Sequence, residues 1–202
     1  MKTIHINEQF KEDWNRVLNH IANLFYEDSV IQFTKDGANM SISFEHGIAD
    51  DYTISTAAKL IVDGQEFTSS YSIGYATEGT EKEQSIRMKR ALSHVMLDVL
   101  EQYTGMTQQW GILTGVRPTK LYHKFRKEGL SEEQIFEKLK TDFRLSDLKI
   151  NLLKEIVARQ LHVIPDLDEL GREISIYIGV PFCPTMCAYC TFPAYAIQSN
   201  RK

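Results

Sequence analysis

A stretch of alternating apolar and polar residues between residues 29 and 75 decides which folds are open to this chain. Four segments in it read as strands, and in the last of them Phe67, Tyr71 and Ile73 share one parity while hydroxyl side chains hold the other. Such alternation places one set of side chains on each face of a strand. Asp-Gly pairs at 36–37 and 63–64 supply the left-handed residues of tight turns. The stretch is therefore predicted to form a small antiparallel sheet.

Helical patterns flank this sheet. The chain begins with a short strand-like segment, KTIHI. Apolar residues then recur at helical spacing over residues 8–25, and they do so again over residues 81–103. Thr80 and Glu83 make a capping-box pattern that opens the second helix. Because each helix has one apolar face, both are expected on one face of the sheet. This predicts an amino-terminal α+β accessory domain over residues 1–108.

From residue 109 the pattern changes to helices. Pro118 suits a first helical position and Gly129 a stop, Ser131 with Gln134 repeats the capping box, and Ser146 opens a third helix. A helical connecting segment is therefore predicted over residues 109–172. The apolar run ISIYIGV then has the character of a buried parallel strand, and it begins a third part, residues 173–202.

Composition and charge narrow the function classes. The chain of 202 residues is 43% hydrophobic and 25% charged, which are ordinary globular values. No apolar run approaches the ~18 to 20 residues of a membrane span, and the start lacks the apolar core of a secretory signal. A formal net charge of −4 disfavours nucleic-acid binding. We therefore expect a cytoplasmic protein without a membrane partner.

All cysteines lie in one short window, as Cys183, Cys187 and Cys190. Their number is odd and their spacing too tight for a disulfide framework. Thiolates are soft ligands that suit iron–sulfur clusters or zinc. Three thiolates leave one iron of a cubane open to another ligand, whereas a structural zinc site needs a fourth, and the nearest upstream histidine is His162. Both readings stay open on the spacing alone.

The flanks of the cysteines point to a family. The run YIGVPFCPTMCAYCTF resembles the start of the radical S-adenosylmethionine enzymes, specifically the oxygen-independent coproporphyrinogen III oxidase-like group. The matching residues are Tyr177, Pro181, Phe182, Cys183, Cys187, Tyr189, Cys190 and Phe192. The upstream text WGILTGVRPTKL resembles the coproporphyrinogen dehydrogenase-like branch of Gram-positive bacteria.

This resemblance implies a fold and a chemistry. Cys183, Cys187 and Cys190 would ligate a 4Fe–4S cluster as metal ligands, and the unique iron would bind S-adenosyl-L-methionine. Tyr177, Phe182 and Tyr189 would be cofactor-binding residues, with Tyr189 beside the adenine. A low-potential electron donor would drive formation of a 5′-deoxyadenosyl radical. The substrate would be coproporphyrinogen III or a related tetrapyrrole, whose propionate side chains lose carbon dioxide in haem biosynthesis.

Two departures from the family pattern limit the transfer. Gly179 stands where the family has histidine, and only twelve residues follow Cys190, so the resemblance implies the first strand and cysteine loop of a truncated (β/α) barrel. We expect an amino-terminal piece of a longer enzyme that is inactive by itself. A lone barrel strand has no partners, so residues 173–202 are predicted to be poorly ordered or packed differently from a barrel.

Two other functions remain open. A haem chaperone-like relative without oxidase activity is one, because Gly179 removes an imidazole that relatives place near cofactor and substrate. A module that binds nucleic acid or a partner is the other, because residues 117–127 hold five Arg or Lys and no acid. That basic run can equally receive substrate carboxylates or be a solvated helix face.

Overall fold

The computed structural model describes residues 2–35, 37–114, 117–169, 174, 176–185, 187–192 and 195–196. The chain divides into two compact units, Met1–Gln160 and Leu161–Lys202. The predicted division at residues 108 and 172 remains a prediction.

The first unit holds a five-stranded sheet with the order β2-β1-β3-β4-β5. Its strands are β1 (Thr3–Ile6), β2 (Val30–Gln32), β3 (Met40–Ile48), β4 (Ile54–Val62) and β5 (Gln65–Ile73). The pairs β3–β4 and β4–β5 are antiparallel, as predicted. However, β1 is parallel to both of its neighbours, with Ile4 opposite Ile31 and Met40. The prediction of a purely antiparallel sheet was therefore wrong, and the sheet is mixed.

The chain path explains the parallel pairs. Helix α1 (Glu12–Ala22) connects β1 to β2, so the chain returns beside β1 in the same direction. The turn around Gly37, which has φ +71°, joins β2 to β3. Because β1 lies between these two strands in the sheet, the turn does not form a hairpin. Asp36 lies outside the described residues. By contrast, Asp63 and Gly64 both have positive φ and form the tight β4–β5 hairpin that their sequence predicts.

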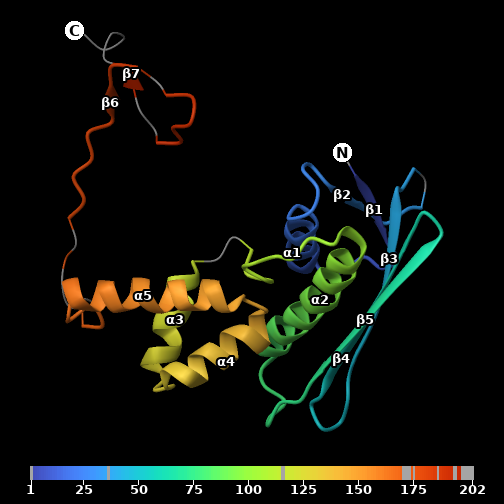
Figure 1. Cartoon of the computed structure of the whole chain (residues 1–202). Coiled ribbons are helices and arrows are strands. Elements are labelled where there is room, and N and C mark those ends of the chain that lie inside the picture. The colour runs from blue at the N-terminus through green and yellow to red at the C-terminus, as the bar shows by residue number, and fades with distance from the viewer. Residues whose placement is uncertain are drawn as a thin grey trace. The chain divides into compact units, whose positions relative to one another are not determined.

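Two helices cover one face of the sheet, as predicted (Figure 1). Helix α1 is shorter than its apolar pattern, whereas α2 (Glu81–Thr104) matches its predicted range closely. The predicted capping box at its start is confirmed. The Thr80 amide donates to the Glu83 carboxylate at 2.7 Å, and the Glu83 amide donates to the Thr80 hydroxyl at 3.3 Å.

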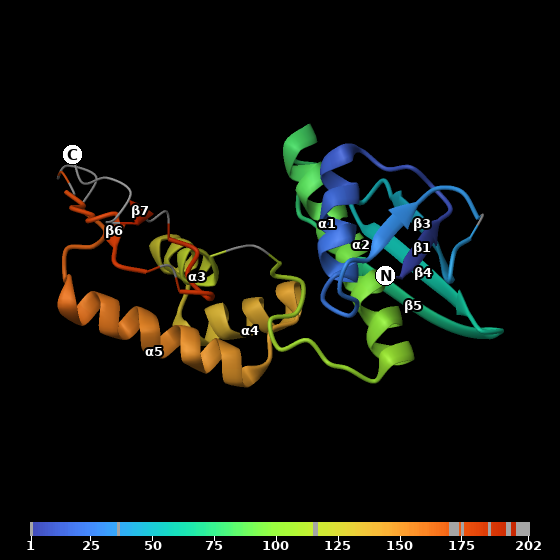
Figure 2. The ribbon, with the colours of Figure 1, turned by 90° about the horizontal axis from the view of Figure 1, so that it is seen from above.

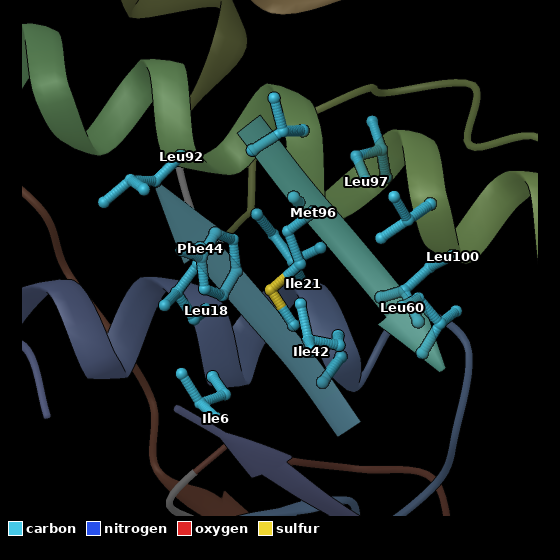
Figure 3. Packing of buried hydrophobic residues seen from close by; sticks show 14 of the residues in the cluster. Ile6, Leu18, Ile21, Ile42, Phe44, Leu60, Leu92, Met96, Leu97 and Leu100 are labelled. Atoms are coloured by element: carbon cyan, nitrogen blue, oxygen red, sulfur yellow. The ribbon is translucent and has the colours of Figure 1, made fainter. Parts of the chain in front are cut away.

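The core forms where α1 and α2 meet the inward face of the sheet (Figure 3). Alternate residues of β3 and β4 point inward, and they meet the apolar stripes of both helices. The central side chains are Leu18 and Ile21 of α1, Ile42 and Phe44 of β3, Leu60 of β4, and Met96 and Leu100 of α2. Burial of each contributes roughly 1.5–3 kcal/mol.

Three more helices follow in the same unit and lie together beyond α2 (Figure 2). They are α3 (Pro118–Lys127), α4 (Glu132–Phe143) and α5 (Asp147–Val163). Pro118 holds the first turn of α3, and Ser131 with Gln134 forms the predicted capping box of α4. The Ser146 hydroxyl accepts from the Lys149 amide at 3.3 Å, which confirms it as the start of α5. Within the described residues, no helix is long and apolar enough to cross a bilayer.

The second unit differs from the prediction of a buried strand. Described residues of ISIYIGV, residues 174 and 176–180, are not in a strand, and Ile174 and Ile178 are 90% and 86% exposed. The short strand β6 (Phe182–Cys183) follows, and it pairs in parallel with β7 (Tyr195–Ala196). The described residues are instead packed differently from a barrel, as predicted for residues 173–202, because a buried parallel strand needs a cover on both faces.

Candidate metal-binding loop

The three cysteines lie on the loop that β6 opens. Cys183 is on β6 and partly buried, whereas Cys187 and Cys190 are exposed, and all three are free thiols. The Cys190 amide donates to the Cys187 carbonyl at 3.0 Å, so the last two cysteines belong to one tight turn. A turn of this kind keeps the backbones of Cys187 and Cys190 close together, while Cys183 belongs to the strand.

The donor set fits a soft metal centre by its chemistry. Three reduced thiols on one short loop are the ligands that iron–sulfur clusters and zinc prefer. Among the described residues, no group of three His, Cys, Asp or Glu side chains is already gathered for a metal, and His162 is not brought to the loop as a fourth ligand. The described geometry therefore presents the ligands without closing a site.

The aromatic residues predicted to bind cofactor lie beside these cysteines in the chain and face solvent. Phe182 precedes Cys183 on β6, and Tyr189 lies inside the Cys187–Cys190 turn with 87% of its surface exposed. Tyr177 is 82% exposed. The structure therefore places all three in the second unit and brings none of them into a pocket among the described residues.

Gly179 lies close to one of these aromatic rings. A Cβ built on Gly179 would stand 3.1 Å from Cε1 of Tyr177, which is tighter than ordinary van der Waals contact. A larger residue at this position requires the Tyr177 ring to move. The glycine that departs from the family pattern is thus also the residue that admits this position of Tyr177.

The described residues that precede the cysteine loop in the chain are mostly apolar and exposed to solvent. Ile174, Ile176, Ile178 and Val180 are each at least 74% exposed. Exposed apolar side chains in a contiguous run mark a surface that another part of a protein covers. This run therefore has the composition of a buried strand, but its four named side chains are exposed to solvent.

The basic run of the sequence forms α3 in the first unit. Tyr122 and Phe125 are buried beneath it, whereas Lys120, Lys124 and Lys127 are exposed. Asp51, in the turn between β3 and β4, caps that turn: its carboxylate accepts from the Thr53 amide at 3.0 Å. That hydrogen bond lowers the pKa of Asp51 and accounts for the residue without a catalytic role.

One polar cluster had no signal in the sequence. His94 of α2 stacks on Tyr71 of β5 with ring centroids 4.1 Å apart, and its Nε2 donates to the Asp142 carbonyl of α4 at 2.9 Å. Burial lowers the pKa of His94, so the neutral imidazole is favoured. These residues come from three separate elements, and only the tertiary structure brings them together.

The comparisons with known proteins identify a relative. The chain is 46% identical over 188 residues to the oxygen-independent coproporphyrinogen-III oxidase-like protein HemZ of Bacillus subtilis (strain 168). The alignment takes in 92% of this chain and 37% of HemZ, so the chain spans little more than a third of that relative. No family model and no solved structure matches the chain.

Proposed function

The chain belongs to the oxygen-independent coproporphyrinogen-III oxidase-like family over the region that it shares with HemZ, and we propose that it is the front part of a radical S-adenosylmethionine oxidoreductase. The observation that carries this proposal is the set of three free thiols with C-x₃-C-x₂-C spacing on a single loop. The proposed role is oxidative decarboxylation of tetrapyrrole propionates in haem biosynthesis. The relative's name supports the substrate class.

The cysteine loop has a defined task in this proposal. Cys183, Cys187 and Cys190 would hold a 4Fe–4S cluster as thiolates, with one iron available to S-adenosyl-L-methionine. When bound, cluster and cofactor would supply one-electron radical chemistry. Tyr189, which lies within the Cys187–Cys190 turn, would contact the adenine, and Tyr177 and Phe182 would contact the cofactor.

The exposed apolar run has a task as well. We assign residues 174–182 to the first strand of a (β/α) barrel whose later strands are carried by sequence beyond this chain. Side chains as exposed as Ile176 and Ile178 support this, because a buried parallel strand has both faces covered. In this assignment residues 1–108 are an accessory domain and residues 109–172 connect it to the barrel. The 202-residue chain alone does not turn over substrate.

The test uses the complete protein, purified and reconstituted with iron and sulfide without oxygen. We expect about four irons per chain and cleavage of S-adenosyl-L-methionine. Cys183→Ala, Cys187→Ala and Cys190→Ala should each lose most of the iron and the cleavage activity. Unchanged iron content in any of these variants contradicts the ligand assignment, and stoichiometric zinc in place of iron favours the structural zinc site.

Gly179 favours one second candidate, a haem chaperone-like function without oxidase activity. Gly179 carries no imidazole, whereas the family resemblance implies one near the substrate at this position. Reconstituted protein that cleaves S-adenosyl-L-methionine, binds haem and leaves coproporphyrinogen III unchanged would establish this alternative. Consumption of coproporphyrinogen III with release of carbon dioxide would establish the oxidase.

A further inference from the structure

Four cations lie along one side of α3, and we call them the cationic stripe: Arg117, Lys120, Lys124 and Lys127. They are separated by three, four and three positions, a spacing that places side chains on one side of a helix. At 1.5 Å of rise per residue the stripe is about 15 Å long. All four side chains are exposed.

The orientation of the stripe is fixed by packing on the other side of the helix. Tyr122 and Phe125 are each only 4% exposed, and Phe125 meets Phe143 of α4 with ring centroids 6.3 Å apart. These aromatic anchors prevent the helix from rotating its charges inward. The stripe is therefore a permanent surface feature of the helical segment.

The local charge is strongly positive in a chain whose net charge is −4. No acidic residue occurs from Arg117 to Lys127, and the nearest following acid, Glu128, contacts Lys124 at 3.6 Å. That pair is exposed and contributes little stability. Like charges grouped on one side of a helix create a positive potential that attracts anions.

The stripe borders a groove whose lining also includes Leu121, His123 and the acidic Glu128. Lysine side chains contribute apolar stems as well as charged ends. The groove therefore combines an apolar floor with a cationic rim. This is the complement of an amphiphile with an apolar body and several carboxylates at its edge.

The same lining argues against single-stranded nucleic acid. Proteins that bind it combine cations with exposed aromatic side chains on which bases stack. The aromatic residues of α3, Tyr122 and Phe125, are buried beneath the helix instead. Within the described residues the groove supplies charge and aliphatic surface, with no Phe, Tyr or Trp in its lining.

We propose that the groove along α3 docks the propionate carboxylates of a tetrapyrrole, in a binding site lined by residues of the first unit. The tetrapyrrole ring lies on Leu121 and the lysine stems, while its peripheral carboxylates pair with Lys120, Lys124 and the guanidinium of Arg117. The identity of the ligand rests on the proposed function, whereas the site rests on the charges and the groove.

The test is a fluorescence titration of the 202-residue chain with coproporphyrin III, the stable oxidised form of the tetrapyrrole. The double variant Lys120→Glu/Lys124→Glu should weaken binding at least about tenfold, and Lys120→Gln/Lys124→Gln by a smaller factor. Lys35→Glu/Lys82→Glu, an equal charge change at two exposed positions outside α3, is the matched control and should leave the affinity unchanged. Circular dichroism establishes that each variant keeps its helices.

Two further ligands sharpen the outcome. A tetracationic porphyrin of the same ring should not bind to the stripe, and higher salt should weaken coproporphyrin III binding. Equal affinity of wild type and the double Glu variant would overturn the proposal. It would also be overturned if a single-stranded oligonucleotide bound more tightly at physiological salt and lost its affinity in the same variant.

This titration is independent of the proposed radical chemistry. It needs no cluster, no S-adenosyl-L-methionine and no turnover. If the complete, reconstituted wild-type protein does not cleave S-adenosyl-L-methionine but still binds the porphyrin, the proposed function alone is rejected. Full oxidase activity without binding at α3 would reject the docking site alone.

Discussion

Arg144 contacts Glu101 at 2.8 Å and thereby ties the end of α4 to α2. The same guanidinium pairs with Asp98 at 2.6 Å and donates to the carbonyl of His94 at 3.2 Å. Arg144 is the residue that ends α4, with a left-handed φ of 59°. One side chain at a helix terminus therefore connects the helical segment to the sheet domain.

Removing this connection should cost stability. Arg144→Met is expected to lower the free energy of unfolding by about 1–3 kcal/mol, because Glu101 is only 15% exposed and loses a charged partner. Lys140→Met, which removes the exposed Lys140–Asp147 pair, is the control and should have little effect. Urea denaturation measures both, and equal small effects would show that the Arg144 contacts contribute nothing.

Gly111 should tolerate no side chain. It has φ +53°, and a Cβ there would fall against the carbonyl oxygens of Phe143 and Arg144. Gly105 also has a positive φ, +69°, but a Cβ there would meet nothing within 4 Å. Gly105→Ala is therefore expected to cost about 1 kcal/mol and Gly111→Ala clearly more. Thermal melts of the two variants separate the backbone strain from the close approach, and matching melting temperatures would contradict the expectation.

His94 should make the fold sensitive to mild acid. Burial lowers its pKa in the folded state, so below about pH 6.5 the unfolded chain binds a proton that the folded chain refuses. This contribution to stability is complete above that pH and is lost as the pH falls through the folded-state pKa. Wild type should therefore lose more stability than His94→Gln between pH 7.5 and about pH 5.

The comparison is made by the difference between the two melting curves at each pH, because acidic residues titrate in both proteins. Exposed His162→Gln serves as a second control for the loss of one histidine. Parallel pH dependences of wild type and His94→Gln would show that the imidazole is not the group responsible.

The core between α2 and the sheet should respond strongly to truncation. Leu100 is fully buried in α2, and Leu100→Ala is expected to cost about 2–5 kcal/mol through lost burial and the cavity left behind. Leu148 of α5 is 66% exposed, and Leu148→Ala should cost a small fraction of that amount. Chemical denaturation distinguishes the two, and similar midpoints would place Leu100 outside the stabilising core.

Local signals in the sequence predicted much of the first unit. The capping boxes at Thr80 and Ser131 depend on residues three positions apart, and both helix starts were correct. Alternation along β4 and β5 likewise predicted which side chains lie inward. Each of these patterns reflects the local geometry of a single element or one turn.

The sequence did not predict which strands pair with one another in the sheet. The strand KTIHI was visible in the sequence, but its place between β2 and β3 and its parallel pairing with both were not, because register and order depend on where α1 returns the chain. The run ISIYIGV shows the same limit: its composition predicts a buried strand, while burial depends on neighbours that the described residues do not supply.

The sequence by itself determined the spacing of the cysteines and the grouping of the charges on one side of α3. Both depend only on residues that are close together in the chain. The contact of Arg144 with Glu101, the stacking of His94 on Tyr71 and the parallel pairs of β1 were decided only by the tertiary structure. These contacts join residues that are far apart in the chain, and their formation depends on the packing of every element between them.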